Sequence, residues 1–147
     1  MKILIISPGK NHDHTVLDGV EEYQTRLEKR FPVEWVFPTI GTKESEGAAI
    51  IKQIKEGDFV VLLDERGKDI DTPTFSKLID RQMQSGTKRI VFVVGGAFGV
   101  STEVKEHAQI SLKLSSLVFP HMLARLILIE QLYRAVSIID GSKYHHV

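Results

Sequence analysis

Short apolar runs alternate with segments of helical periodicity along this chain, and their order predicts an α/β fold. Consecutive apolar residues are typical of parallel strands buried on both faces, whereas apolar positions three or four apart are typical of helices. The expected strands are 2–7, 33–37, 59–63, 89–94 and 110–114, and the expected helices are 15–30, 44–55, 72–84, 101–107 and 121–139. We therefore expect an open, mostly parallel sheet flanked by helices.

The helix expected over 72–84 has the clearest start signal. Thr72 suits the N-cap, and Pro73 suits the first helical position, where its missing N–H costs nothing. Gly86 lies just beyond the expected end, where glycine commonly stops a helix.

Residues 121–139 are apolar on nearly every side, whereas a surface helix shows a single apolar stripe. A chain of 147 residues can only partly bury such a helix within its own fold. We therefore expect one face to meet another subunit, most simply in a two-fold homodimer. Glu130 and Arg134 are four apart on this helix and are expected to form a supporting pair.

The composition is that of one globular domain, residues 1–147, with 42% hydrophobic and 26% charged residues. There is no cysteine, which excludes thiol catalysis and cysteine-based zinc sites and is consistent with the reducing cytosol. The apolar run 3–6 is too short for a signal-peptide core or a membrane span. We expect a cytoplasmic protein without a membrane partner.

The charge balance argues against a generic nucleic-acid binder, because 19 basic residues match 19 acidic ones and no basic stretch occurs. The distribution is uneven, however. From Lys113 to the C-terminus there are four basic residues, two acidic residues and three histidines. This segment leaves room for a local basic surface.

A glycine cluster, Gly95-Gly96-x-x-Gly99, directly follows the fourth expected strand, where α/β sheets bind ligands. Its spacing is not that of the dinucleotide fingerprint, and the chain has no Walker A motif, which argues against nucleotide hydrolysis. A tight turn that needs positive φ and a ligand-binding loop are equally good interpretations of the cluster.

Two other polar groups are weaker candidates. His12-x-His14 lacks a third ligand at a familiar spacing, so we interpret both as solvated side chains and expect no metal site. Asp64 and Glu65 follow a strand, where a carboxylate can bind a ribose or act as a base. A solvated turn stabilised by a neighbouring cation is the simpler interpretation.

The last third of the chain gathers most of the polar groups suited to chemistry. The loop 114–121 can offer backbone N–H and C=O groups to a flat heterocycle. Arg125 follows in an apolar neighbourhood, where its charge needs an anion or a carbonyl. Tyr144, His145 and His146 form either a frayed end or a lid that stacks on a base and moves protons. These features indicate a cofactor site beside a substrate site.

Together, the motifs resemble the RlmH family, small SPOUT-class methyltransferases of bacterial large-subunit ribosomal RNA. Each motif is modest alone, but the ordered set is highly specific and spans the chain. The motifs are Leu63-Asp64-x-x-Gly67-Lys68, Gly95-Gly96-x-x-Gly99, Leu114-Ser115 to Phe119-Pro120-His121, Arg125, Glu130-x-x-Tyr133-Arg134-Ala135 and Tyr144-His145. His146 and Val147 depart from the family, which often ends in a basic residue.

The resemblance implies an S-adenosylmethionine-dependent methyltransferase that acts on N3 of a pseudouridine in 23S rRNA. It implies a homodimer that works on the assembled ribosome, with no metal and no DNA partner. It also implies a SPOUT-type fold with a C-terminal trefoil knot, which no residue pattern predicts because threaded chains are nearly absent from folds in general.

The resemblance also implies which residues form the site. Arg125, Tyr144 and His145 would be catalytic, and His121 would lie near the target nucleotide with Arg125 and Tyr144. Arg125 would stabilise negative charge on the uracil carbonyls, His145 would accept the N3 proton directly or through water, and Tyr144 would stack on the base. The cofactor would be bound by Leu63, Gly95, Leu114, Ser115, Ser116, Leu117, Val118 and Phe119.

Two other functions stay open at this point. A ribosome-binding or assembly module would keep the fold without methyl transfer, although the intact glycine loop, Arg125 and Tyr144-His145 argue against it. An α/β enzyme that uses a nucleotide-like cofactor on a small molecule would suit the neutral charge. If the substrate is the assembled ribosome, neutrality fits recognition of a shaped cleft, and we expect poor activity on free rRNA.

Overall fold

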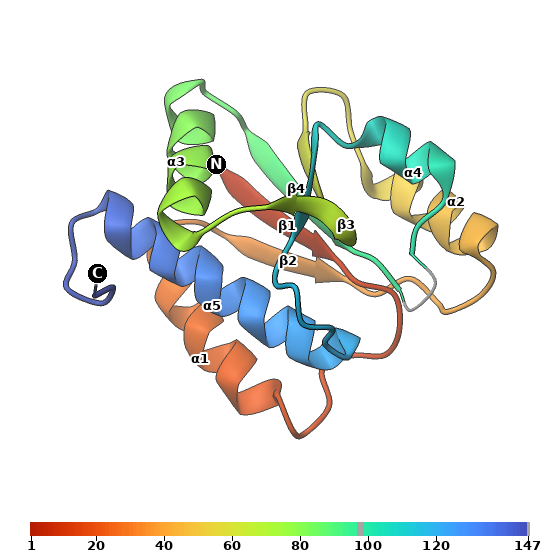
Figure 1. Ribbon diagram of the computed structural model, residues 1–147, viewed down its shortest axis with the longest axis horizontal. Helices are drawn as coiled ribbons and strands as arrows, with labels where there is room; N and C mark the ends of the chain where they lie inside the picture. Colours follow the sequence, from red (N-terminus) through yellow and green to blue (C-terminus); the bar gives the residue numbers. More distant parts are fainter. Residues whose placement is uncertain (97–98, 147) are drawn as a thin grey trace.

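The computed structural model describes residues 1–96 and 99–146. Within these residues, five strands form one sheet in the order β2-β1-β4-β3-β5, and every neighbouring pair is parallel (Figure 1). The strands are β1 (Lys2–Ile6), β2 (Val33–Val36), β3 (Phe59–Asp69), β4 (Arg89–Val94) and β5 (Ile110–Lys113). The predicted parallel α/β sheet is confirmed.

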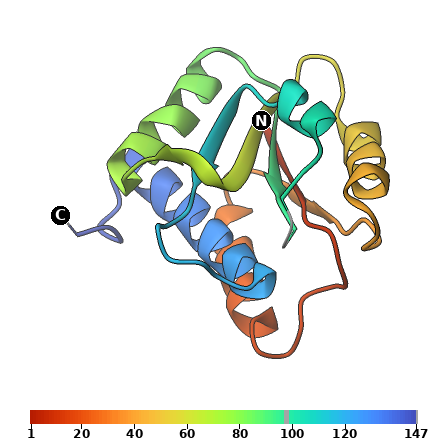
Figure 2. The same cartoon turned by 45° about the vertical axis from the view of Figure 1, so that its right-hand side comes forward.

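Helices cover both faces of the sheet, as predicted. On one face lie α1 (Leu17–Leu27), α3 (Thr72–Gln84) and α5 (His121–Ile139), with α5 in contact with both others. On the other face lie α2 (Lys43–Gln53) and α4 (Thr102–His107), which contact each other (Figures 1 and 2).

The central strands are apolar at successive positions because both faces of the sheet are covered. In β1, Ile3 and Ile5 belong to the core that includes α1 and α5, whereas Leu4 and Ile6 belong to the core beneath α2 and α4. All four side chains are at most 2% exposed. This two-sided burial explains why the strands appear as continuous apolar runs in the sequence.

The long helix α5 is covered only in part within one chain. Leu128 and Ile129 on its inner side are fully buried. Near its start, Leu123 is 37% exposed, and Leu117 and Val118 in the preceding loop are 73% and 72% exposed. An apolar surface therefore stays open around the start of α5. No helix in the described part of the chain is long and apolar enough to cross a membrane.

The start of α3 differs from the prediction by one residue. The N-cap is Asp71, whose carboxylate accepts a hydrogen bond from the Thr74 N–H at 2.9 Å. Thr72 is instead the first helical residue, and its hydroxyl donates to Gln131 Oε1 at 2.8 Å. Aspartate and threonine are both good N-caps, so the prediction chose the wrong one of two adjacent candidates.

The strand β3 is longer than predicted. The prediction ended it at Leu63, where the apolar run stops, but the strand continues past the charged residues that follow. Leu112 of β5 pairs with Leu63 and again with Lys68, so residues 64–67 form an irregularity between the two pairings, which we name the β3 bulge. Gly67 permits this close approach, because a Cβ there would lie 2.5 Å from the carbonyl carbon of Leu112.

Candidate cofactor and substrate site

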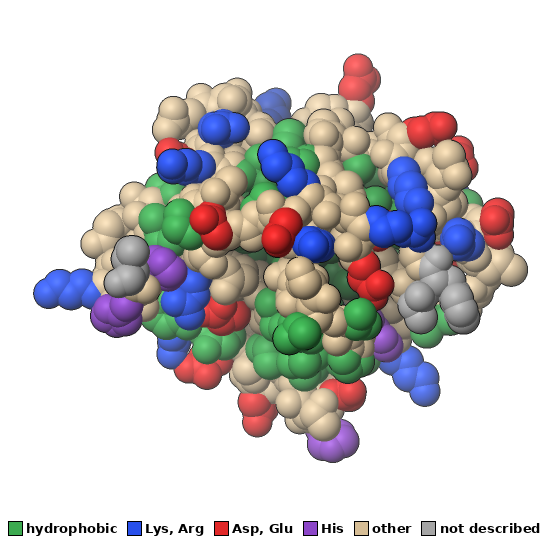
Figure 3. Space-filling model, in the orientation of Figure 1, with side chains coloured by type: hydrophobic (Ala, Val, Ile, Leu, Met, Phe, Trp, Pro, Cys, Tyr) green, Lys and Arg blue, Asp and Glu red, His purple; other side chains and the backbone are tan. Residues whose placement is uncertain are grey.

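A cavity of about 360 Å³ lies at the carboxyl ends of β4 and β5, beside the β3 bulge. Open α/β sheets bind ligands at this edge, and the volume is in the range of small-molecule sites. Figure 3 shows a hollow near the middle of this face, with acidic and basic side chains at its upper edge and apolar ones below. The lining residues are Leu63, Asp64, Glu65, Arg66, Val94, Gly95, Gly96, Gly99, Lys113, Leu114, Ser115, Leu117, Val118, Phe119 and Ala124.

Most residues predicted to bind the cofactor surround this one cavity. They come from distant parts of the chain and meet because the carboxyl ends of parallel strands share one edge of the sheet. Ser116 is the exception: it is exposed, and its hydroxyl accepts a hydrogen bond from Lys113 Nζ at 3.2 Å. Seven of the eight line the cavity, namely Leu63, Gly95, Leu114, Ser115, Leu117, Val118 and Phe119. Contact with a cofactor stays a prediction.

The glycine motif after β4 forms part of the cavity wall. Gly95 and Gly96 leave the backbone open to a ligand, and a Cβ at Gly95 would lie 3.4 Å from the Leu63 carbonyl oxygen. Gly99 has a φ of +80°, which favours glycine. The two variable positions of the motif, 97 and 98, lie outside the described residues. The three glycines therefore border the cavity, and the binding of a ligand by the motif stays a prediction.

Arg125 is fully buried in the second turn of α5. Its Nε donates a hydrogen bond to Ser7 Oγ at 2.7 Å, its Nη1 donates to the Lys10 carbonyl oxygen at 2.8 Å, and its Nη2 donates to the Pro8 carbonyl oxygen at 3.3 Å. The guanidinium carbon lies 4.6 Å from the centre of the Phe37 ring. Burial lowers the pKa of Arg125. The carbonyls that its charge requires come from the loop after β1, and in this conformation the side chain does not border the cavity.

His121, the first residue of α5, lies close to Arg125. A Cβ at Gly9 would lie 3.4 Å from His121 Nε2 and 3.6 Å from Arg125 Nη2, so both side chains approach the same glycine. Partial desolvation lowers the pKa of His121, and the charge of Arg125 lowers it further. His121 also lies two residues after Phe119, which lines the cavity. Its place at the start of α5 is therefore next to the predicted cofactor loop.

The C-terminal tail folds back on α5 of its own chain. The Tyr144 hydroxyl donates a hydrogen bond to Glu130 Oε1 at 3.0 Å, and the ring packs edge-on against Tyr133 with centroids 4.7 Å apart. The Arg134 guanidinium carbon lies 4.7 Å from the centre of the Tyr144 ring. His145 Nδ1 lies 3.3 Å from Arg134 Nη1. Residues 144–145 are therefore docked on the helix and not frayed.

The predicted pair of Glu130 and Arg134 is confirmed and forms the base of this docking site. Arg134 Nε donates a hydrogen bond to Glu130 Oε1 at 2.9 Å, and the contact raises the pKa of Arg134. Burial, followed by contacts with Tyr23 and Glu130, raises the pKa of Tyr144. Docked in this way, Tyr144 is a hydrogen-bond donor at neutral pH and not a base.

The docked tail and the cavity lie at different levels of α5. Ala124 borders the cavity, whereas Arg134 holds the tail ten residues later, which corresponds to about 15 Å along the helix axis. Neither Tyr144 nor His145 lines the cavity. In this conformation, the tail does not reach the cavity of its own chain.

Four charged residues around the cavity were not predicted as site residues: Asp64, Glu65, Arg66 and Lys113. The available signal was the position of Asp64 and Glu65 directly after an apolar run. We interpreted that position as a solvated turn, because the bulge that turns these residues toward the cavity depends on pairing with β5, which is distant in the sequence.

The prediction that His12 is solvated is wrong. Its ring packs edge-on against Trp35 with centroids 4.4 Å apart, and its Nδ1 is buried without a hydrogen-bond partner in the part of the chain that the structure describes. Burial, together with the charge of Arg125, lowers the pKa of His12 to about 4. His14 is exposed, as predicted. Within residues 1–96 and 99–146, no three His, Asp or Glu side chains are placed to hold a metal ion together.

Comparison with known proteins identifies the family. The model of a family described as predicted SPOUT methyltransferase matches residues 1–145. The chain belongs to this SPOUT methyltransferase family. A relative from Parabacteroides distasonis, named Ribosomal RNA large subunit methyltransferase H, is 40% identical over 99% of each chain. A relative of the same name from Trichlorobacter lovleyi is 38% identical over 99% of this chain and 100% of its own. The resemblance drawn from the ordered motifs is thus confirmed.

A solved structure from Legionella pneumophila, described as a putative methyltransferase in complex with the bound cofactor SAM, has a similar fold. The TM-score is 0.50 at 13% sequence identity, and the match covers 92% of this chain and 66% of that chain. At this identity the likeness concerns the fold alone. This SPOUT family member therefore shares its α/β architecture with a solved structure that contains SAM.

Proposed function

We propose that this SPOUT family member transfers a methyl group from S-adenosylmethionine to N3 of a pseudouridine in 23S rRNA of the assembled ribosome. The observation that carries the proposal is that seven residues expected to bind the cofactor line one cavity. Relatives named Ribosomal RNA large subunit methyltransferase H support the substrate class. The bound SAM of the Legionella protein supports the cofactor class.

The lining of the cavity fits this cofactor. Leu63, Gly95 and the loop 114–119 provide apolar side chains and open backbone, which suit a flat and uncharged adenine. The β3 bulge provides charged groups, which suit the polar remainder of the molecule. When bound, the cofactor supplies a methyl group on a positively charged sulfur.

Transfer to N3 requires an aligned acceptor and removal of its proton. We assign proton removal to His145, directly or through water, and stacking on the base to Tyr144. His121 lies two residues after Phe119 of the cavity, and we assign it a contact with the same nucleotide.

The role proposed for Arg125 differs from the first expectation. Its guanidinium is enclosed by the loop after β1, so stabilisation of charge on the uracil carbonyls would require that loop to open. We propose that Arg125 acts as a positioning residue that fixes the first turns of α5. The adjacent residue Ala124 borders the cavity, which connects this position to the site.

A homodimer explains two features that a single chain leaves open. The apolar surface formed by Leu117, Val118 and Leu123 is exposed, and a two-fold partner would cover it. The tail docks about 15 Å along α5 from the cavity of its own chain. We propose that the tail of one subunit completes the cavity of the other.

The balance of 19 basic and 19 acidic residues supports a folded ribosomal particle as substrate. An enzyme that searched naked RNA would gain from a strongly basic surface, because phosphate contacts dominate that binding.

The proposal includes a cytoplasmic location, a single domain over 1–147 and the C-terminal trefoil knot implied by the resemblance.

Mass spectrometry of rRNA tests this function. A bacterial strain that lacks the gene should contain 23S rRNA without the N3-methyl group, and the wild-type gene should restore it. The purified protein should methylate ribosomes from this strain and act poorly on protein-free 23S rRNA. Unchanged methylation in the deletion strain would refute the proposal. Ribosome binding without methyl transfer would instead indicate an assembly module.

A further inference from the structure

The cavity has a charged side and an uncharged side. Its charged lining residues are Asp64, Glu65, Arg66 and Lys113, and three of these belong to the β3 bulge. The described residues on the other side, in the glycine motif and the loop 114–119, are uncharged. A ligand that fills the cavity therefore meets its charges at the bulge and the end of β5.

The position of the bulge is fixed by backbone contacts. A Cβ at Gly67 would lie 2.5 Å from the carbonyl carbon and 2.7 Å from the nitrogen of Leu112, so only glycine permits this packing. Asp64 Oδ1 accepts a hydrogen bond from the Arg66 N–H at 2.9 Å. The carboxylate of Asp64 is thus used inside the bulge, which leaves the side chains of Glu65 and Arg66 for other contacts.

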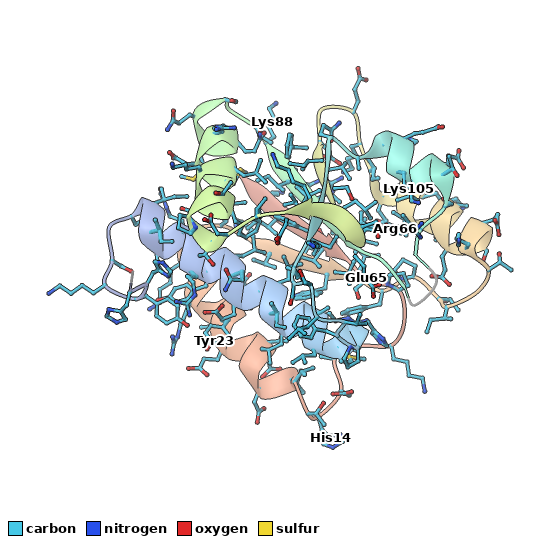
Figure 4. All side chains as sticks on the ribbon, in the orientation of Figure 1. His14, Tyr23, Glu65, Arg66, Lys88 and Lys105 are labelled. Carbon is cyan, nitrogen blue, oxygen red and sulfur yellow. The ribbon has the colours of Figure 1, made fainter. Side chains whose placement is uncertain are left out.

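Glu65 and Arg66 are exposed at the mouth of the cavity. Among residues 1–96 and 99–146, their side chains form no hydrogen bond and no ion pair. A Cβ at Gly99 would lie 3.8 Å from Arg66 Nη2, so the guanidinium extends toward the glycine motif. Figure 4 shows both side chains where the β3 ribbon turns, on the side of α4.

We infer that Glu65 and Arg66 bind the amino-acid end of the cofactor, a step that rests on the proposed function. That end is a zwitterion, with an α-ammonium group suited to Glu65 and an α-carboxylate suited to the planar fork of Arg66. The adenine is uncharged and suits the opposite side of the cavity. The pair therefore sets a preference for adenosyl ligands that keep both charges of the amino acid.

Calorimetry with three ligands tests this assignment. S-adenosylhomocysteine has both charges, its decarboxylated form has only the ammonium group, and 5′-methylthioadenosine has neither. Arg66→Gln should weaken S-adenosylhomocysteine binding about tenfold without weakening the other two ligands. Glu65→Gln should weaken the two ligands with an ammonium group about tenfold and leave 5′-methylthioadenosine within about twofold.

Matched controls come from α4, which lies nearby but does not line the cavity. Lys105→Gln and Glu103→Gln remove exposed charges of the same signs and should leave all three affinities unchanged. Equal losses for the three ligands, or no loss for S-adenosylhomocysteine in the two bulge variants, would overturn the inference while the proposed function stands. If the unaltered protein binds none of the three, the proposed function fails and the inference fails with it.

Discussion

The Tyr144 hydroxyl donates a hydrogen bond to Glu130 Oε1 at 3.0 Å and thereby ties the C-terminal tail to α5. The same carboxylate oxygen pairs with Arg134, whose guanidinium lies against the Tyr144 ring. This docking site is about 15 Å along the helix from the cavity residue Ala124. A catalytic tail must therefore leave this position or act on the cavity of a second subunit.

Mixed dimers distinguish these two arrangements. One subunit carries Gly95→Trp, which fills the cavity, and the other lacks residues 144–147. If the tail serves the partner's cavity, each mixed dimer keeps one complete site, and a statistical mixture should show about a quarter of the wild-type activity. Co-expression followed by a ribosome methylation assay measures it. Each variant alone is the control, and inactive mixed dimers would contradict the arrangement.

Arg125→Met tests whether this side chain holds the loop after β1. The change leaves the Pro8 and Lys10 carbonyls without their donor, so we expect the free energy of unfolding to fall by about 3 kcal/mol. Urea unfolding measures the loss. Arg26→Met is the control, because Arg26 pairs with Glu22 at the surface and should cost less than about 1 kcal/mol. Equal losses in the two variants would show that Arg125 does not have this structural role.

His12 makes stability depend on pH. Burial lowers its pKa to about 4 in the folded chain, whereas the ordinary value of 6.5 applies to the unfolded chain. Between these two pH values, the unfolded chain therefore binds the proton more readily. The contribution of neutral His12 to the free energy of unfolding is therefore fully present above pH 6.5 and is lost as the pH falls toward 4. His12→Phe keeps a ring against Trp35 and should flatten this dependence in urea unfolding. Identical slopes for the variant and the parent would contradict the burial of His12.

Gly67→Ala tests whether the close packing of Gly67 against the backbone of Leu112 positions the β3 bulge. The added methyl group would overlap the backbone of Leu112, so we expect both a lower melting temperature and weaker S-adenosylhomocysteine binding. Gly57→Ala is the control, since it has open space and a φ of +88° and should cost only about 1 kcal/mol of backbone strain. Ligand affinity should not change in the control. A smaller stability loss at Gly67 than at Gly57 would show that the bulge tolerates displacement.

The parts of the fold that sequence predicted well are those with a strong apolar pattern. The strand 89–94 and the helix 121–139 have the predicted bounds, because their residues are apolar wherever the core requires it. The continuation of β3 past Leu63 was missed because its residues are charged. What extends that strand is pairing with Leu112, and this contact between distant positions leaves no local signal.

The site was predictable to a similar degree. The motifs identified the loop 114–119 and the glycine cluster, and parallel topology brings both to one cavity. The enclosure of Arg125 could not be predicted, because it depends on two backbone carbonyls and one hydroxyl contributed by the loop after β1. The role of the charged residues Asp64, Glu65 and Arg66 was missed because their orientation depends on the β3 bulge. Pairing with the distant strand β5 creates that bulge.

The central claim is that the cavity at the ends of β4 and β5 holds the methyl donor, and a crystal structure of the protein grown with S-adenosylhomocysteine tests it most directly. We expect the adenine between Leu63, Gly95 and the loop 114–119, with the amino-acid end toward the β3 bulge. A ligand bound elsewhere on the protein, or a cavity filled by the protein's own side chains while ligand is present, would contradict the account.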